Sequence, residues 1–117
     1  MNVANKNKIL DLIEAGGAIN KIAAYKYVGS GIYALDTTLV DTVSWGAAAG
    51  GILTNSAVVS LENNSGGSIT VQGVVLYSSA VPVSNFDDTV AVYPFSTQVT
   101  LDDGEILRLN TVTYTID

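Results

Sequence analysis

Two short clusters of acidic residues carry the side chains of this 117-residue chain that are best suited to chemistry. One is Asp87-Asp88 and the other is Asp102-Asp103-Gly104-Glu105. Carboxylates at this density could bind calcium, or one acid from each cluster could form the acid/base pair of a glycosidase. Asp and Gly are frequent turn residues, and neither cluster matches the twelve-residue calcium loop. The sequence therefore predicts two turns here, with no metal and no cofactor.

The residue types that are missing exclude several kinds of catalysis. The chain has no histidine and no cysteine, which rules out imidazole bases, thiolate nucleophiles and disulfide bonds. Residues 46–51 are rich in glycine but lack the lysine and helix of a phosphate-binding loop. Asn63-Asn64-Ser65 fits the N-glycosylation pattern, yet residues 1–8 are too polar for a secretory signal, so we interpret it as a turn. We expect a protein that is not an enzyme.

Aromatic side chains offer one further candidate site. Tyr25, Tyr27 and Tyr33 lie close together in the sequence and, with Trp45, could form a platform on which a glycan stacks. Aromatic residues at alternating strand positions are more often part of a core or a cross-strand pair. We therefore interpret Trp45 as a core anchor at the end of a strand, and a carbohydrate-binding module remains an alternative function.

Composition and charge indicate a protein that associates with others. Hydrophobic residues make up 48% of the chain and charged residues only 14%, which leaves neutral surface available for contacts. Residues 1–26 hold all four lysines against Asp11 and Glu14, a net charge of +2, whereas residues 27–117 hold Arg108 against nine acids, a net charge of −8. The acidic part repels phosphate backbones, so nucleic acid is not an expected partner. No apolar run reaches the roughly 18 residues of a membrane span, and a membrane is not expected either.

A short helix is predicted near the start of the chain. It begins at about Asn5 or Asn7, either of which could cap it, and ends at Ala15 before Gly16-Gly17. Its apolar stripe consists of Ile9, Leu12 and Ile13.

A helix of about three turns is marginal alone in water, so this stripe must dock either on the sheet of the same chain or on a neighbouring subunit. Periodicity does not distinguish the two. We expect residues 1–17 to form a helical leader that acts as an assembly tether, and residues 18–117 to form the β domain. The expected assembly interface consists of Lys6, Lys8, Ile9, Leu12 and Ile13.

The remainder of the chain predicts a mainly β fold. Runs rich in β-branched and aromatic residues alternate with Gly, Asn and Asp clusters, at spacings typical of an antiparallel β-sandwich or jelly roll of about eight strands. Expected strands include residues 21–28, 32–35, 39–45, 57–62, 68–79 and 89–95.

Particular residues predict how these strands turn and bend. Residues 63–67 and 102–104 should each close a hairpin. Within residues 68–79, Ile69 and Val71 should share a face with Val75, and Gly73 should mark a bulge or a close approach. Pro94 places the end of its strand at a sheet edge. The last strand changes phase near Asn110-Thr111, which requires a bulge or a crossing between sheets.

Several segments together resemble a set of small virion proteins of tailed phages, labelled tail-fibre, head-fibre or decoration proteins. In that set a Trp-Gly-Ala-Ala segment precedes a glycine and an Asn-Ser pair, and a Gly-Asp-type turn precedes a threonine-rich last strand. The matching segments here are VSWGAAAGG (43–51), Asn55-Ser56-Ala57, LDDGEI (101–106) and TVTYTID (111–117). Asp103-Gly104-Glu105 stands where Gly-Asp is usual, and the likeness is strongest over residues 43–57.

The resemblance implies a role in assembly rather than catalysis. It implies a small β domain, a trimer or another homo-oligomer, that is made in the host cytoplasm and added to a virion. The first expectation is a capsid decoration or cement protein that binds the major capsid protein. The alternative within this class is a tail-fibre, baseplate or adaptor subunit that binds tail proteins.

Overall fold

The computed structural model describes residues 2–27, 33–83 and 86–116, which form a mainly β protein with one helix at the start, as the sequence predicts. A 3-10 turn, Phe86–Asp88, lies between the fifth and sixth strands. The helix and strands are α1 (Val3–Ala15), β1 (Lys21–Tyr27), β2 (Tyr33–Thr42), β3 (Ile52–Thr54), β4 (Val59–Glu62), β5 (Ile69–Tyr77), β6 (Ala91–Leu101), β7 (Ile106–Leu109) and β8 (Thr113–Thr115).

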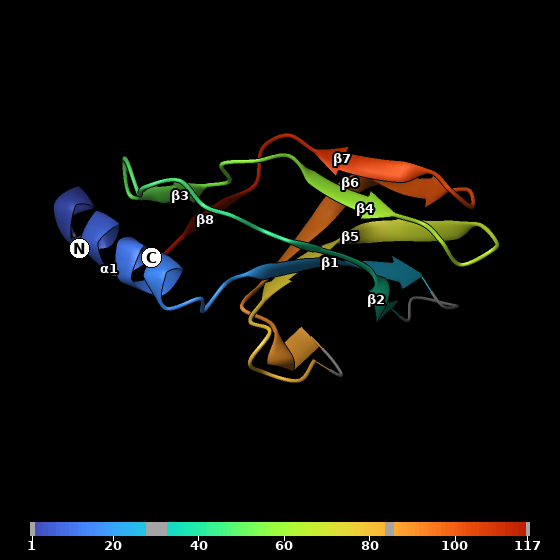
Figure 1. The fold of residues 1–117 in the computed structure, drawn as a ribbon, viewed down its shortest axis with the longest axis horizontal. Coiled ribbons are helices and arrows are strands. Elements are labelled where there is room, and N and C mark those ends of the chain that lie inside the picture. The colour runs from blue at the N-terminus through green and yellow to red at the C-terminus, as the bar shows by residue number, and fades with distance from the viewer. Residues whose placement is uncertain (1, 28–32, 84–85, 117) are drawn as a thin grey trace.

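The strands form one four-stranded antiparallel sheet and two short antiparallel ribbons. The sheet has the order β2-β1-β5-β6, and the ribbons are β3-β8 and β4-β7 (Figure 1). The β4-β7 ribbon lies over the sheet, with β4 beside β2, and the β3-β8 ribbon continues it toward α1. Over the described residues the strands do not close into a complete sandwich or jelly roll.

Some expected strands are merged or displaced. Residues 32–35 and 39–45 were expected as two strands, but the structure has one strand, β2, from Tyr33 to Thr42. Its residues 33–36 and 40–42 both pair with β1, on either side of a register shift. A short strand, β3, forms after the glycine-rich segment by pairing with β8. Strand β6 continues past Pro94 to Leu101, and within the described chain it lies at the edge of the sheet.

Both expected hairpins are wrong, because each turn joins strands of different sheets. Strand β4 pairs with β7, whereas β5, which follows the first turn, pairs with β1 and β6. The turn after β6 likewise leads into β7 rather than back along β6. Turn residues specify a reversal of the chain but not the strand that will be the partner afterwards.

Asn63 holds these two turns together. Its side chain is completely buried, which is rare for an asparagine. Its amide Nδ2 donates to two backbone carbonyls at 2.7 and 2.8 Å, and its Oδ1 accepts two hydrogen bonds. Its backbone N–H and C=O bond across to the second turn, so each of its polar groups has a partner. The partners of Asn63 are Ser65, Gly67, Leu101, Gly104 and Glu105.

A bulge at Gly73 reverses the faces of β5. The register shifts between Val71 and Gly73, so Ile69 and Val71 share the core face with Val74 and Leu76, while Val75 lies on the other face. The expected grouping of Val75 with Ile69 and Val71 is wrong for this reason. The close approach expected at Gly73 is confirmed: a Cβ there would overlap the Tyr25 ring and the backbone carbonyl of Tyr93.

The phase change near Asn110 is confirmed as a crossing between ribbons. Strand β7 ends at Leu109 and β8 begins at Thr113 on a different partner strand. Asn55 fixes the break, because its Nδ2 donates to the Asn110 carbonyl at 3.1 Å and its Oδ1 accepts from the Val112 N–H at 2.8 Å.

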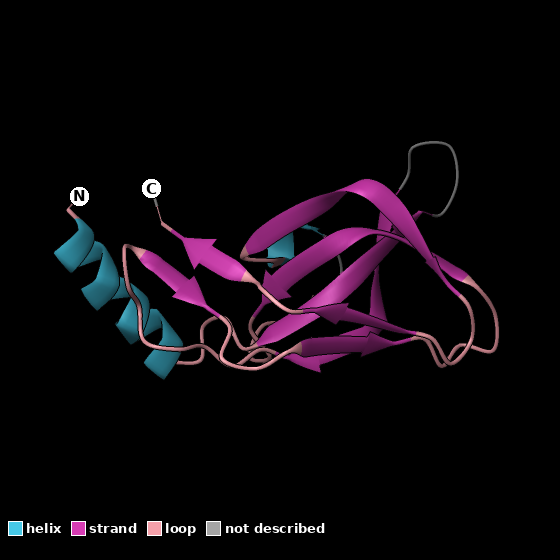
Figure 2. Cartoon of the chain, turned by 90° about the horizontal axis from the view of Figure 1, so that it is seen from above, coloured by secondary structure: helices cyan, strands magenta, loops and turns pink. Residues whose placement is uncertain are grey.

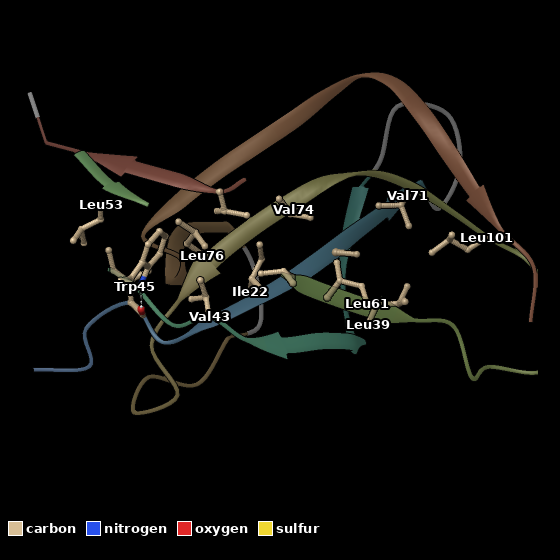
Figure 3. Packing of buried hydrophobic residues seen from close by; sticks show 14 of the residues in the cluster. Ile22, Leu39, Val43, Trp45, Leu53, Leu61, Val71, Val74, Leu76 and Leu101 are labelled. Carbon is tan, nitrogen blue, oxygen red and sulfur yellow. Dashed lines mark hydrogen bonds between the residues drawn. The ribbon is translucent and has the colours of Figure 1, made fainter. Parts of the chain in front are cut away.

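The larger of two hydrophobic clusters in the described chain lies between the sheet and the ribbons (Figure 3), and the smaller one, with Tyr25 and Val75, lies on the other face of the sheet. Leu39, Leu61 and Val71 fill one end, and Leu53 and Trp45 fill the end near α1. The Trp45 ring is 9% exposed, and its Nε1 donates to the carbonyl of Ile19 at 2.7 Å. Trp45 thus joins the core to the segment that connects α1 with β1.

We expect Asn63→Ala to destabilise the fold by about 2 to 4 kcal/mol, because it removes the side chain that bonds the buried Leu101 carbonyl and the part-buried Ser65 N–H, and it empties a fully buried position. Urea unfolding of the purified chain measures this loss. The adjacent, exposed Asn64→Ala is the matched control and should unfold like the wild type. Equal unfolding midpoints for the two variants would contradict the role assigned to Asn63.

Gly73→Ala should cost about 1 to 3 kcal/mol, since the added methyl has no room between the Tyr25 ring and a backbone carbonyl. Gly67→Ala adds the same methyl where no atom lies within 4 Å, and its thermal midpoint should change little. Trimming the ring in a Tyr25→Ala background should not rescue Gly73→Ala, because the Tyr93 carbonyl stays in place. A full rescue would show that the bulge can relax.

Candidate assembly interface

The local sequence of α1 determines where it begins and ends. Asn2 is the N-cap, and its side-chain oxygen accepts from the Asn5 N–H at 2.9 Å. The expected caps, Asn5 and Asn7, are wrong because the helix begins at Val3 and the Asn7 side chain is used elsewhere. Gly16 ends the helix, as expected. At 13 residues, α1 is too short to cross a membrane, and no other described helix is long and apolar enough to do so.

One face of α1 docks on the chain's own β domain. Leu10 is completely buried in the core cluster. On either side of it, Asn7 Oδ1 accepts from the Gly51 N–H and Asp11 Oδ1 accepts from the Ala48 N–H, both at 2.8 Å. These bonds hold the helix against residues 46–51 and β3 (Figure 2). The glycine-rich segment thus presents its backbone to polar side chains of α1.

The opposite face of α1 is exposed and partly apolar. We call it the α1 outer face and define it as Asn5, Lys8, Ile9 and Leu12, which border a shallow groove of about 240 Å³. The Leu12 side chain is 71% exposed and that of Ile9 is 37% exposed. The expected stripe is therefore not the docked one, because the buried residue is Leu10.

The structure divides the interface expected from the sequence. Lys8, Ile9 and Leu12 lie together on the α1 outer face. Lys6 instead lies beside residues 46–51, the segment against which α1 docks. Its Cδ would be 3.3 Å from a Cβ added at Gly51. Ile13 is half-buried and packs against the core. Sequence periodicity could not separate these two groups, because a stripe of Ile9, Leu12 and Ile13 is as regular as one that contains Leu10.

Two of the four aromatic residues proposed as a glycan platform, Tyr25 and Trp45, are part of the packing. Tyr25 is 5% exposed and meets the Phe86 ring edge-on, with centroids 5.1 Å apart and planes at 75°. Trp45 lies in the core. Neither ring offers an open face for stacking. The side chains of Tyr27 and Tyr33 lie outside the described part of the chain.

The carboxylates of the second acidic cluster bond to the two turns. Asp103 Oδ1 accepts from the Gly66 N–H at 2.8 Å, Asp102 Oδ1 accepts from the Ser68 hydroxyl at 2.7 Å, and Glu105 Oε1 accepts from the N–H of Asp102 at 2.7 Å. Asp87 and Asp88 lie in the 3-10 turn between β5 and β6. Among the described residues, no three acids gather as metal ligands.

An apolar hollow that the sequence did not indicate lies between β6 and the ribbons. It has a volume of about 210 Å³, and the side chains around it include Val74, Tyr93, Phe95, Leu109 and Val112. The Tyr93 hydroxyl donates to a backbone carbonyl of β8 at 2.8 Å. Burial raises the pKa of this hydroxyl, and the nearby Tyr114 raises it further. In the sequence these residues look like ordinary core positions of strands, so nothing in them predicts an opening. The opening results from the strand pairing, which leaves this side of the core uncovered.

Comparison with known proteins adds no relative. No protein-family model, curated protein or solved structure matches the chain.

Leu10 and Leu12 test the orientation of α1 with the same substitution on one helix. Leu10→Ala should lower the free energy of unfolding by about 2 to 5 kcal/mol, as a core truncation does. At a protein concentration low enough to keep the chain monomeric, Leu12→Ala should change it by no more than about 0.5 kcal/mol, because its side chain is exposed in the single chain. Chemical denaturation measures both. A larger loss for Leu12→Ala than for Leu10→Ala would mean that the helix docks through the other face.

Proposed function

We propose that this chain is a non-enzymatic structural protein of a tailed-phage virion, which joins the particle as an oligomer through the α1 outer face. The observation that supports it is the exposure of Leu12 and Ile9 on a helix that is already docked through Leu10. A docked helix gains nothing from the parts of these two aliphatic side chains that stay in water. Burying a fully exposed aliphatic side chain is worth roughly 1.5 to 3 kcal/mol, and because Leu12 is 71% and Ile9 37% exposed, a partner that covers both gains about 1.5 to 3 kcal/mol in total.

We propose a capsid decoration or cement protein as the form of this role. The resemblance of residues 43–57 to phage virion proteins supports a virion role, and the low content of charged residues favours association with other chains. A tail-fibre, baseplate or adaptor subunit would use the same exposed apolar surface on a different part of the particle.

We infer further that the fold is an open form of the predicted sandwich. Two layers of strands face each other, and the side where β2 meets β4 is fastened by Asp41, whose Oδ2 accepts from the Ser60 N–H at 2.8 Å. The side between β6 and the ribbons holds the apolar hollow. Association with another chain would complete the second side.

Leu12→Glu tests this proposal in cells that assemble the particles. Because Leu12 is exposed, the variant should fold like the wild type, yet it should be absent from particles purified on a density gradient. Val58→Glu is the matched control, since Val58 is also exposed and directly precedes β4 instead of belonging to α1. Mass spectrometry of the particle fractions measures each chain.

Wild-type protein and Val58→Glu should both appear in the particle fractions. Absence of the wild type from particles would overturn the proposed function. Full incorporation of Leu12→Glu would show that the α1 outer face is not the surface used.

A further inference from the structure

We propose that the α1 outer face of one copy binds a second copy of this chain, in the apolar hollow between β6 and the ribbons. The inference rests on the proposed function and deepens it, because it names the partner of the same surface. Copies would then join head to tail, with a helix from each entering the β domain of the next.

The distribution of charge selects this arrangement. Lys8 is the single charged residue among those that define the α1 outer face, whereas residues 27–117 carry a net charge of −8. Two α1 outer faces in contact would bring Lys8 against Lys8, and two β domains in contact would bring acid against acid. The helix as a whole is neutral, since Asp11 and Glu14 balance Lys6 and Lys8, but its outer face presents Lys8 to a β domain of net negative charge. Complementary charge fixes which surfaces meet more than how tightly they bind.

The hollow supplies the apolar counterpart on the β domain. Among the described residues that line it, none is charged, and β6 has no charged residue from Ala91 to Leu101. Leu12 and Ile9 can therefore leave water there without forcing a charge of the partner to be buried. Lys8 borders the same groove as Leu12, so its ammonium can stay at the rim in solvent while its stem packs.

The sheet pairing explains why this side needs a cover. Tyr93, Phe95 and Leu109 belong to the core cluster but are only partly buried, so the core reaches the surface here. Within the described chain, β6 pairs with β5 and β7 pairs with β4, and neither strand pairs with the other. Between Val99 and Pro94 the β6 register slips strongly against β5, and such a bulge hinders the addition of another strand. Side chains of a helix, rather than a strand, suit this opening.

We call the contact between the α1 outer face of one copy and the apolar hollow of the next the joint. It links two different patches, so it is heterologous, and it closes into a ring when the rotation between copies allows it. A trimer, which the resemblance to phage virion proteins implies beside other homo-oligomers, is such a ring. The chain measures 45 × 27 × 26 Å, and α1 lies at one end of the long axis (Figure 1). Its radius of gyration, 14.7 Å, exceeds the about 13.4 Å expected for a compact domain of this length. The helix is thus placed to reach a neighbour.

Two variants, each defective in one half of the joint, test the proposal by analytical ultracentrifugation of the full chain. Leu12→Glu damages the helix and leaves the hollow intact. Thr111→Arg puts a charge at an exposed position that lines the hollow and leaves the helix intact. The wild type and Val58→Glu should be oligomers, and each joint variant alone should be a monomer with the circular dichroism spectrum of the wild type.

An equimolar mixture of Leu12→Glu and Thr111→Arg should form dimers, because the intact helix of one fits the intact hollow of the other. A joint between identical patches, or one at another site, would give no such rescue. Lys8→Glu should weaken association about tenfold at low ionic strength and less at high salt. An unchanged association of Lys8→Glu at low salt would overturn the charge argument.

A monomeric wild type, an oligomeric Leu12→Glu or a mixture without dimers would overturn the proposal. These outcomes are separable from failure of the proposed function, because sedimentation requires no particles. A monomer that still enters virions would refute the joint alone. An oligomer assembled as described, but never found in virions, would refute the virion role alone.

Discussion

The burial of Leu10 against the β domain is the contact on which the functional account depends. It fixes the rotation of α1 about its own axis, with Asn7 and Asp11 anchoring it to backbone N–H groups on either side. Once Leu10 points inward, Ile9 and Leu12 must point away from the core, because neighbouring helix positions are about 100° apart. The exposure of the α1 outer face is therefore a geometric consequence of the docking. Because this face is partly apolar, covering it with a partner would be favourable.

A second constraint shapes the β domain, where two turns are fastened to each other rather than closing hairpins. Buried Asn63 satisfies backbone groups of both turns, and the acids of the second turn bond to the first. Together with the Asp41 bond between β2 and β4, this closes the layers at one end and along one side. The remaining side keeps its apolar side chains at the surface. The open hollow and the exposed helix face thus arise from how the chain distributes its few strong polar contacts.

Local features of this fold could be predicted from the sequence, whereas the pairing of the strands and the docked face of α1 could not. The phase change near Asn110 and the close approach at Gly73 follow from alternation and from the absence of a side chain, which are properties of single strands. Strand pairing after residues 63–67 depends on the buried bonds of Asn63, and composition gives no sign of them. For α1, a stripe of Ile9, Leu12 and Ile13 is as regular as one that contains Leu10. The polar anchors Asn7 and Asp11, one turn apart around Leu10, were the signal that could have decided it.

Association through the α1 outer face is the central claim, and photo-crosslinking from position 12 tests it most directly. A photoreactive amino acid replaces Leu12 in the full chain, and mass spectrometry identifies the peptide that it captures when the protein is labelled in isotopically mixed form. The account predicts crosslinks between copies, to peptides from β6 or from residues 107–113. Crosslinks confined to the same copy, or none at a concentration where the protein is oligomeric, would contradict it.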